Sequence, residues 1–264
     1  MHKRALDNQS GAGMVELLIG IVAAVILLGL ATVTFTRQQT LFKNQNDETN
    51  IRALGRYGIR ELAKDLRMAG YGLPASLAVS SASSTAITYR TNSDDVSATA
   101  ASDISAAATT VTLTAADVDS DGSSDLASGQ SVVIFTAASS EAELATVSSV
   151  AGNVLTLSSA TDNAYSTDDA IFVNKYHTVA YSYDAANKKI VKSVDGGTDS
   201  TLVENATSLT FVYRNSANAA LTSPLSAADL TAVRKIEISL ALQDSLNASA
   251  SAQYDTAVEL RNLM

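Results

Sequence analysis

The chain has 264 residues and a net charge of −9, and it contains no cysteine. This length allows one large or two small domains, and the missing cysteines exclude disulfides, thiolate metal ligands and cysteine nucleophiles. The charge is uneven, because residues 75–264 hold nine Lys and Arg against twenty-one Asp and Glu, a net −12. Such an acidic body repels phosphate groups, so we do not expect nucleic acid to be a primary partner.

The first predicted element is a membrane-spanning helix. Leu17–Thr36 holds 20 residues without a charge, and as a helix this stretch is long enough to cross a hydrocarbon core of ~30 Å. His2, Lys3 and Arg4 precede it, and positive residues stay on the cytoplasmic side. We therefore expect a single pass through the inner membrane, with the residues after Arg37 exported to the periplasm.

Three kinds of N-terminal segment fit this stretch: a plain anchor, a secretory signal peptide, and a leader followed by an assembly helix. Glu16 separates them, because a carboxylate inside an apolar run costs ~2.5 kcal/mol or more near the membrane centre and usually has a functional partner. A signal peptide has no use for it. Gly29-Leu30-Ala31 nonetheless offers a signal-peptidase site, which keeps open a secreted protein that starts near Thr32.

The residues around Glu16 read GAGMVELL from Gly11 to Leu18 and resemble the cleavage and methylation motif of type IV prepilins. The resemblance implies that prepilin peptidase cuts after Gly11, that Ala12 becomes an N-methylated terminus, and that Glu16 meets the terminal amine of a neighbouring subunit. Two buried opposite charges satisfy each other only in register. The family usually has Phe or Met first in the mature chain. Cleavage after Gly13 would supply Met but would move Glu16 from fifth to third place, so we predict cleavage after Gly11.

An amphipathic helix is predicted to continue past the membrane. No proline interrupts the chain before Pro74, and Gly70 and Gly72 provide a stop. One helix is therefore expected from Ala12 to about Ala69, roughly 87 Å long at 1.5 Å per residue. Apolar or small residues recur there at spacings of three and four, which is the pattern of one buried helix face: Ile51, Leu54, Gly58, Leu62, Leu66 and Ala69.

Positive charge recurs on a different face of this helix. Four basic residues follow one another at intervals of four: Arg52, Arg56, Arg60 and Lys64. Such a row fits either a solvated surface or a contact with a neighbour's acidic body.

The end of the helix resembles a narrower family. Residues 61–72 read ELAKDLRMAGYG, which is similar to the pattern that closes the long helix of PilW-like minor pilins. The resemblance covers residues 11 to 74 and is looser beyond them. It implies a pilin fold of the α+β class, in which the long helix packs on an antiparallel β-sheet.

The rest of the chain alternates β-branched runs with Ser, Asp, Asn and Gly clusters, as β-rich domains do. We expect strands at Ala86–Thr91, Thr110–Thr114, Ser131–Thr136, Glu143–Val150, Asn153–Leu157, Ala170–Asn174, Val179–Tyr183, Ile190–Val194, Ser208–Tyr213 and Arg234–Gln243. The predicted parts are a leader (1–11), a transmembrane and filament-core helix (12–36), its amphipathic half (37–74), a pilin β-sheet domain (75–95 and 175–264) and an inserted β-rich subdomain (96–174).

An acidic loop inside the predicted insertion has calcium-site spacing. Residues 117–125 read DVDSDGSSD, which places carboxylates at positions one, three, five and nine around a glycine turn, and hard oxygen ligands suit Ca²⁺. An EF-hand would have Glu at position twelve, where this chain has Ser128. A Ca²⁺ site and a solvated Asp-rich turn both fit; the candidate ligands are Asp117, Asp119, Asp121 and Asp125.

Catalytic signals are weak, and we do not expect an enzyme. Of the two histidines, His2 lies in the predicted leader and His177 at a strand edge, without a motif that would complete a Ser-His-Asp arrangement. No P-loop or dinucleotide fingerprint is present. A structural or surface role is the expected one for His177.

Three functions remain open. The first is a minor pilin of a type IV pilus, in or priming the filament and reaching the cell surface after assembly. Its partners would be other major and minor pilins, prepilin peptidase, the inner membrane and the pilus assembly machinery. The second is a J-like pseudopilin of a type II secretion system. The third is a secreted, calcium-stabilised β-domain cut after Ala31.

Overall fold

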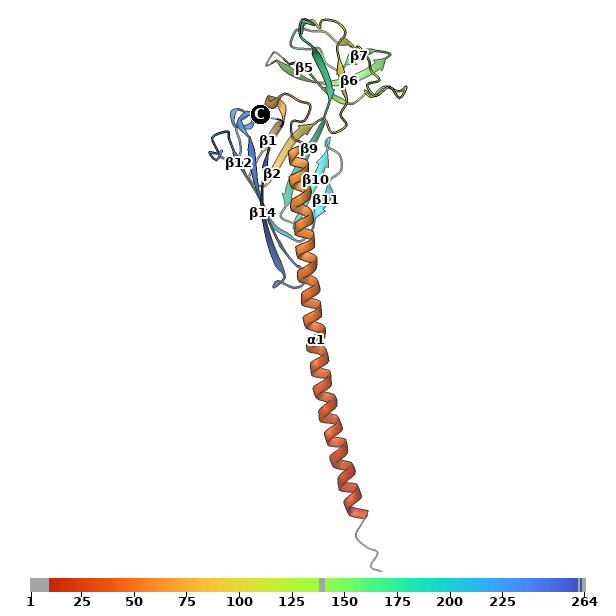
Figure 1. Cartoon of the computed structure of the whole chain (residues 1–264), viewed down its shortest axis with the longest axis vertical. Helices are drawn as coiled ribbons and strands as arrows, with labels where there is room; N and C mark the ends of the chain where they lie inside the picture. Colours follow the sequence, from red (N-terminus) through yellow and green to blue (C-terminus); the bar gives the residue numbers. More distant parts are fainter. Residues whose placement is uncertain (1–9, 138–140, 261, 263–264) are drawn as a thin grey trace, which may run out of the picture. The chain divides into compact units, whose positions relative to one another are not determined.

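The structure is a computed structural model that describes residues 10–137, 141–260 and 262. The protein is α+β, with one long N-terminal apolar helix and strands that all pair in the antiparallel sense (Figure 1). The described residues divide into two compact units, one ending at Asn50 and one beginning at Ile51. Residues 1–9, which make up most of the predicted leader, lie outside the described residues.

Helix α1 (Ser10–Arg67) runs without a break for 58 residues. No proline lies within it, so every backbone N–H beyond the first turn can bond along the helix. The chain then leaves the helix through Gly70 and Gly72, whose φ angles are +75° and +68°, values that favour glycine. The predicted helix from 12 to about 69 is confirmed within two residues. Its predicted amphipathic half is too long at 74, because residues 68–74 form turns around these two glycines.

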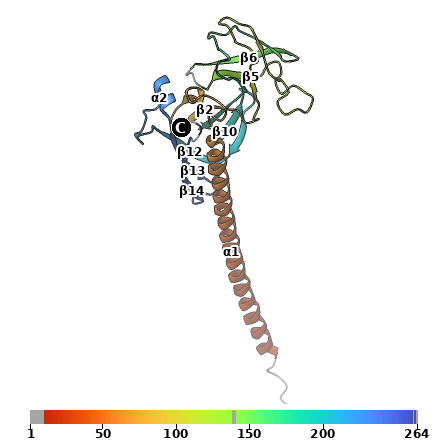
Figure 2. The same cartoon turned by 45° about the horizontal axis from the view of Figure 1, so that its top comes forward.

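Two sheets and the second half of α1 build the larger core. One sheet has the strand order β1-β2-β9-β10-β11 and the other β12-β13-β14. Their bounds are Val79–Ala82 (β1), Ala86–Thr91 (β2), His177–Asp184 (β9), Lys189–Val194 (β10), Ser200–Val203 (β11), Ala206–Arg214 (β12), Lys235–Gln243 (β13) and Ser251–Glu259 (β14). A short helix, α2 (Ala227–Ala232), lies between β12 and β13 in the chain (Figure 2).

The division into two sheets differs from the single sheet that the sequence predicts. The predicted strands at 179–183 and 190–194 pair with each other as β9 and β10, but the strand at 208–213 joins β13 in the second sheet. The chain turns between β11 and β12 at Asn205, which has a φ of +59°. Asn tolerates this left-handed conformation better than most residues. The turn that separates the two sheets therefore needs no glycine, and the sequence pattern does not predict it.

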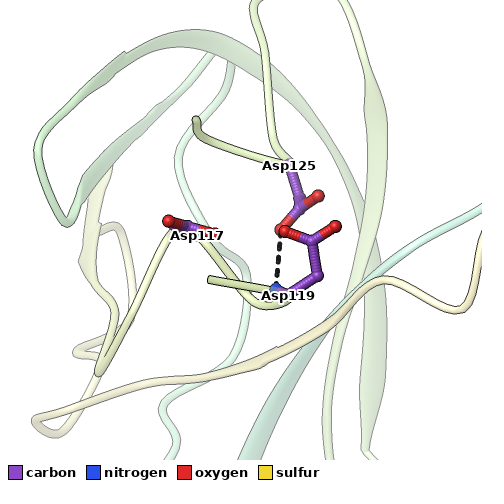
Figure 3. A group of neighbouring side chains, drawn as sticks. All are labelled: Asp117, Asp119 and Asp125. Carbon is purple, nitrogen blue, oxygen red and sulfur yellow. Dashed lines mark hydrogen bonds between the residues drawn. The ribbon is translucent and has the colours of Figure 1, made fainter. Parts of the chain in front are cut away.

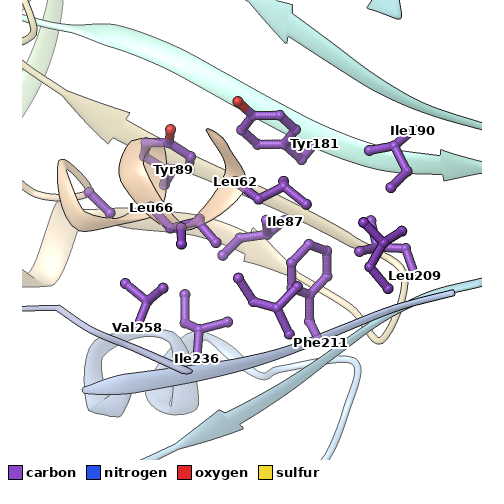
Figure 4. Packing of buried hydrophobic residues seen from close by; sticks show 14 of the residues in the cluster. Leu62, Leu66, Ile87, Tyr89, Tyr181, Ile190, Leu209, Phe211, Ile236 and Val258 are labelled. Atoms are coloured by element: carbon purple, nitrogen blue, oxygen red, sulfur yellow. The ribbon is translucent and has the colours of Figure 1, made fainter. Parts of the chain in front are cut away.

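Leu62 and Leu66 of α1 fill the space between the two sheets and have no exposed surface. Figure 4 places them among Ile87 and Tyr89 of β2 on one side and Ile236 of β13 on the other. Fully burying one leucine side chain is worth about 1.5–3 kcal/mol. The predicted apolar stripe is therefore the face of α1 that meets the core.

Two glycines let this helix approach the sheets closely. A Cβ atom on Gly58 would stand 2.3 Å from Val203 Cγ2, and one on Gly55 would stand 2.3 Å from Tyr254 Cε2. Both distances are far below van der Waals contact. Glycine lowers helix stability by about 1 kcal/mol relative to alanine, so its presence here reflects close packing.

A polar contact fixes the same helix segment to the first sheet. The carboxylate of Asp65 accepts hydrogen bonds from the hydroxyl of Tyr181 and, at 2.5 Å, from Nζ of Lys192. Burial of the ring, followed by the contact with Asp65, raises the pKa of Tyr181. Asp65 therefore accepts from a tyrosine hydroxyl that stays protonated at neutral pH.

The third sheet has the order β3-β8-β5-β6-β7-β4 and a hydrophobic cluster of its own, formed by residues from Val96 to Val173. Its strands are β3 (Ser97–Thr99), β4 (Thr110–Thr112), β5 (Ser131–Thr136), β6 (Ala142–Ala151), β7 (Val154–Leu157) and β8 (Ile171–Lys175). Two segments of similar sequence, TTVTLTA (109–115) and NVLTLSS (153–159), pair with each other through β4 and β7.

We predict that Gly58→Ala lowers the free energy of unfolding by about 1–3 kcal/mol, because the added methyl group overpacks the contact with Val203. Helix propensity alone would give the opposite sign. Urea denaturation of the full chain in a non-ionic detergent, followed by circular dichroism, measures the change. The control is Tyr57→Ala, since Tyr57 is the preceding residue and is 55% exposed; we expect it to stay within about 0.5 kcal/mol of the wild type. A stabilised Gly58→Ala chain would contradict the packing argument.

Candidate functional site

The first half of α1 exposes its apolar side chains on all sides. The described chain contains one helix long and apolar enough to cross a membrane, and none of its most apolar window is buried. The large apolar side chains from Met14 to Phe42 are between 50% and 73% exposed. A soluble protein rarely leaves so large a contiguous apolar surface in water, so this segment needs a lipid or protein environment.

The hydroxyl groups of the apolar segment suit such an environment. Thr32, Thr34 and Thr36 donate to the carbonyl oxygens of Leu28, Leu30 and Thr32 at 2.8, 2.9 and 3.1 Å. A hydroxyl without a partner would be costly in hydrocarbon. These bonds within the helix therefore let the three threonines enter an apolar medium.

The residues of the predicted prepilin motif lie at the beginning of α1. Gly11 and Ala12 belong to its first turn, and Glu16 follows Ala12 by four residues, which places both on one side of the helix. The Glu16 side chain is exposed, and within the described part of a single chain it has no ion pair. The neighbouring subunit's amine that the resemblance implies as its partner stays a prediction. Cleavage and methylation stay predictions.

The acidic loop brings together three of its four predicted ligands. Carboxylate oxygens of Asp117, Asp119 and Asp125 all lie within 4.8 Å of one another (Figure 3). Asp121 stands outside this group, because its carboxylate accepts from the N–H of Ser123 at 2.8 Å and from the Ser123 hydroxyl. Of the four aspartates predicted to bind one cation, three lie together and the fourth, Asp121, is held away from them by its hydrogen bonds to Ser123.

Backbone N–H groups compete with a cation for the same oxygens. Asp125 accepts from the N–H groups of Val118 and Asp119 at 2.6 and 3.3 Å, and Asp117 accepts from Gly122 at 2.8 Å. The N–H of Asp121 lowers the pKa of Asp119, but desolvation of its carboxylate and the negative charges of Asp121, Asp125 and Asp117 outweigh this bond and raise the pKa overall. An acidic turn stabilised by its own backbone and a Ca²⁺ site both remain compatible with this geometry.

His177 belongs to a charged cluster that sequence inspection missed. Its Nδ1 lies 2.6 Å from a carboxylate oxygen of Asp195, and its Nε2 lies 2.9 Å from one of Asp94. Lys175 Nζ is 2.5 Å from the same Asp94 oxygen. Asp94 comes from the segment that enters the third sheet, whereas Lys175 and His177 come from the segment that leaves it, so the cluster ties the two crossing segments together.

The protonation of this cluster follows from its contacts. Burial opposes the charged form of His177, but the two carboxylates outweigh it and raise the pKa of the imidazole above 6.5. Hydrogen bonds from Lys175 and His177 lower the pKa of Asp94 to about 2. A histidine whose two ring nitrogens both contact carboxylates has no nitrogen left to accept a proton from a nucleophile. Below its raised pKa, this ring is therefore a structural imidazolium that bridges two carboxylates.

Comparisons with known proteins identify no relative of the whole chain. No family model matches it, and no curated protein matches it. Parts of three phage tailspikes are similar. The first is Gp54 of Acinetobacter baumannii bacteriophage AP22 in complex with A. baumannii capsular saccharide, with 23% identity over 30% of this chain and a TM-score of 0.25. The second is gp61 of Pseudomonas phage phi297, with 20% identity over 29% of this chain and a TM-score of 0.25. The third is gp49 of Pseudomonas phage LKA1, with 18% identity over 36% of this chain and a TM-score of 0.23. Each match spans 14% of the tailspike, and at such TM-scores the likeness carries no argument.

We predict that Asp119→Ala lowers the melting temperature in millimolar Ca²⁺ but not in a chelator, if the loop binds this cation. Occupancy at about 100 times the dissociation constant would contribute about 2.7 kcal/mol to stability. Asp119 suits the test because its carboxylate accepts only one backbone bond, from Asp121 at 3.1 Å. Asp168→Ala is the control, since Asp168 is another exposed aspartate of the predicted insertion. Equal melting of the variant and the wild type in both conditions would exclude the calcium site.

We predict that the Asp94–His177 cluster makes stability depend on pH at both ends. The raised pKa of His177 means that the ring's contribution to the free energy of unfolding is fully present below about pH 6.5 and is lost as the pH rises through the raised pKa. The lowered pKa of Asp94 means that the carboxylate's contribution to the free energy of unfolding is fully present above about pH 4 and is lost as the pH falls towards about 2. His177→Gln should cost about 0.5–1.5 kcal/mol at pH 5.5 and much less at pH 9.

Urea denaturation at these two pH values measures the difference. His2→Gln is the matched control, because His2 is the other histidine of the chain. An equal cost of His177→Gln at both pH values would contradict the charged state assigned to the ring.

Proposed function

We propose that this chain is a minor pilin of a type IV pilus, incorporated in the filament or priming its assembly, and without enzymatic activity. One observation carries the proposal: a single helix has a first half whose apolar side chains are all exposed and a second half that is packed on two sheets. A subunit that moves from a membrane into a helical filament needs both halves, because lipid and then neighbouring helices cover the first while the second holds the exported body.

The position of Glu16 supports the same proposal. Its carboxylate lies in an apolar stretch and has no ion pair within the described residues, a placement that costs free energy in a membrane. The N-methylated amine of a neighbouring subunit, formed after cleavage between Gly11 and Ala12, would offset this cost. The charge pair would then form only when two subunits stand in the correct register.

The proposal assigns partners to the parts of the chain. Prepilin peptidase processes the N-terminus, the inner membrane holds the helix before assembly, and other major and minor pilins surround it afterwards. The pilus assembly machinery moves the subunit into the filament, which places the body on the cell surface. The sheet between Val96 and Lys175 would project from a tip subunit, where it is available for adhesion or surface motility.

We predict that Glu16→Gln abolishes incorporation into fibres, because the amide keeps the size of the side chain but not its charge. Glu16→Asp is the matched control and should retain part of the incorporation. Immunoblots of the sheared surface fraction of the native host measure incorporation, and blots of the membrane fraction confirm that each variant is made. Wild-type amounts of Glu16→Gln in fibres would refute the charge-pairing role, and absence of the wild-type chain from sheared fibres would refute the pilus proposal.

A further inference from the structure

The exposed face of the second half of α1 carries only positive charge. All five basic side chains between Ile51 and Gly70 are exposed: Arg52, Arg56, Arg60, Lys64 and Arg67. At 100° per residue they occupy a stripe about 120° wide along the helix. We call these five residues the cationic stripe. The two acidic residues of the same segment, Glu61 and Asp65, are partly buried and lie beside this face.

The stripe is only partly neutralised within the chain. Lys64 forms a surface pair with Glu61 at 3.3 Å, and such an exposed pair contributes little. Asp65 bonds to Lys192 and Tyr181 on the other side. Among the described residues, the side chains of Arg56, Arg60 and Arg67 form no ion pair. Positive charge therefore persists on one helix face of a chain whose residues 75–264 carry a net −12.

We propose that the cationic stripe docks on the acidic body, residues 75–264, of a second copy of this chain. The inference rests on the proposed function and adds the surface and the partner. Complementary charge supports this partner, because the chain itself supplies the excess of carboxylates that the stripe lacks. Opposite fields speed association and exclude partners of the wrong sign.

The sign of the charge also limits how two copies can meet. Two cationic stripes would repel each other, so the stripe cannot face its own copy across a two-fold axis. The stripe must instead meet a different surface of its neighbour. Such a contact is either reciprocal, which closes a two-fold dimer, or repeated head to tail, which generates a ring or an open helical assembly.

A photo-cross-linker tests the contact directly. Tyr57 lies at the edge of the stripe and is 55% exposed, so replacing it with benzoylphenylalanine keeps every charge. We would mix isotopically labelled and unlabelled full-length chains in a non-ionic detergent, irradiate them, and identify joined peptides by mass spectrometry. The expected product links residue 57 of one copy to a peptide from residues 75–264 of another.

Two changes should remove this product. Arg56→Glu together with Arg60→Glu should lower its yield at least about fivefold, whereas Arg56→Lys with Arg60→Lys, the charge-preserving control, should not. Raising the salt to about 1 M, where the Debye length is about 3 Å, should act like the charge reversal. Benzoylphenylalanine at Val212, a 37% exposed position on β12, controls for random collisions within a micelle.

Other outcomes would overturn the inference. If neither charge reversal nor high salt changes the yield of the cross-link, the apolar helix alone brings the copies together. If the cross-linker forms adducts only with detergent or added phosphatidylglycerol, the stripe faces lipid. Failure of the stripe is distinguishable from failure of the proposed function. In the first case the charge-reversed chain still enters sheared fibres, whereas in the second the wild-type chain is absent from them even when the cross-link forms.

Discussion

The constraint on which this protein depends is that one apolar helix is longer than the core available to cover it. From Ile51 to Ala69 the helix α1 turns its apolar stripe towards two sheets. Up to Asn50 the described chain offers no such cover, and the apolar side chains remain exposed. A lone helix of this kind cannot remain in water. Membrane insertion, and in our proposal filament assembly, follow from this unmet demand for an apolar environment.

The second half of α1 shows what is needed to attach a body to such a helix. Gly55 and Gly58 remove the side chains that would hold the sheets away, and Asp65 adds one polar contact to the first sheet. Apolar packing provides most of the stabilisation, because it is proportional to the area buried, whereas the polar contact specifies how the helix is rotated. The same rotation leaves the basic side chains outside, so packing of the core and presentation of the cationic stripe have one cause.

The sequence predicts the parts of the fold that rest on local patterns and misses those that depend on tertiary contacts. The strands at Ala86–Thr91 and Ser131–Thr136, which are rich in β-branched and aromatic residues, are confirmed at both ends. Strand β14 was missed, since few large apolar residues mark SAQYDTAVE as a strand. The partners of His177 were also unpredictable, because Asp94 is 83 residues away. In the acidic loop, the spacing predicts four aspartates as candidate ligands, but it does not predict that the carboxylate of Asp121 accepts a hydrogen bond from the Ser123 hydroxyl instead.

The mature N-terminus tests the central claim most directly. Mass spectrometry of the chain recovered from membranes and sheared fibres of its native host would identify the first residue and any methyl group on it. The account predicts N-methylated Ala12, which places Glu16 fifth and gives each subunit the amine that its neighbour's carboxylate requires. A chain that begins near Thr32, or one that still carries Met1, would contradict the account, because the assembly helix would be missing in the first case and unprocessed in the second.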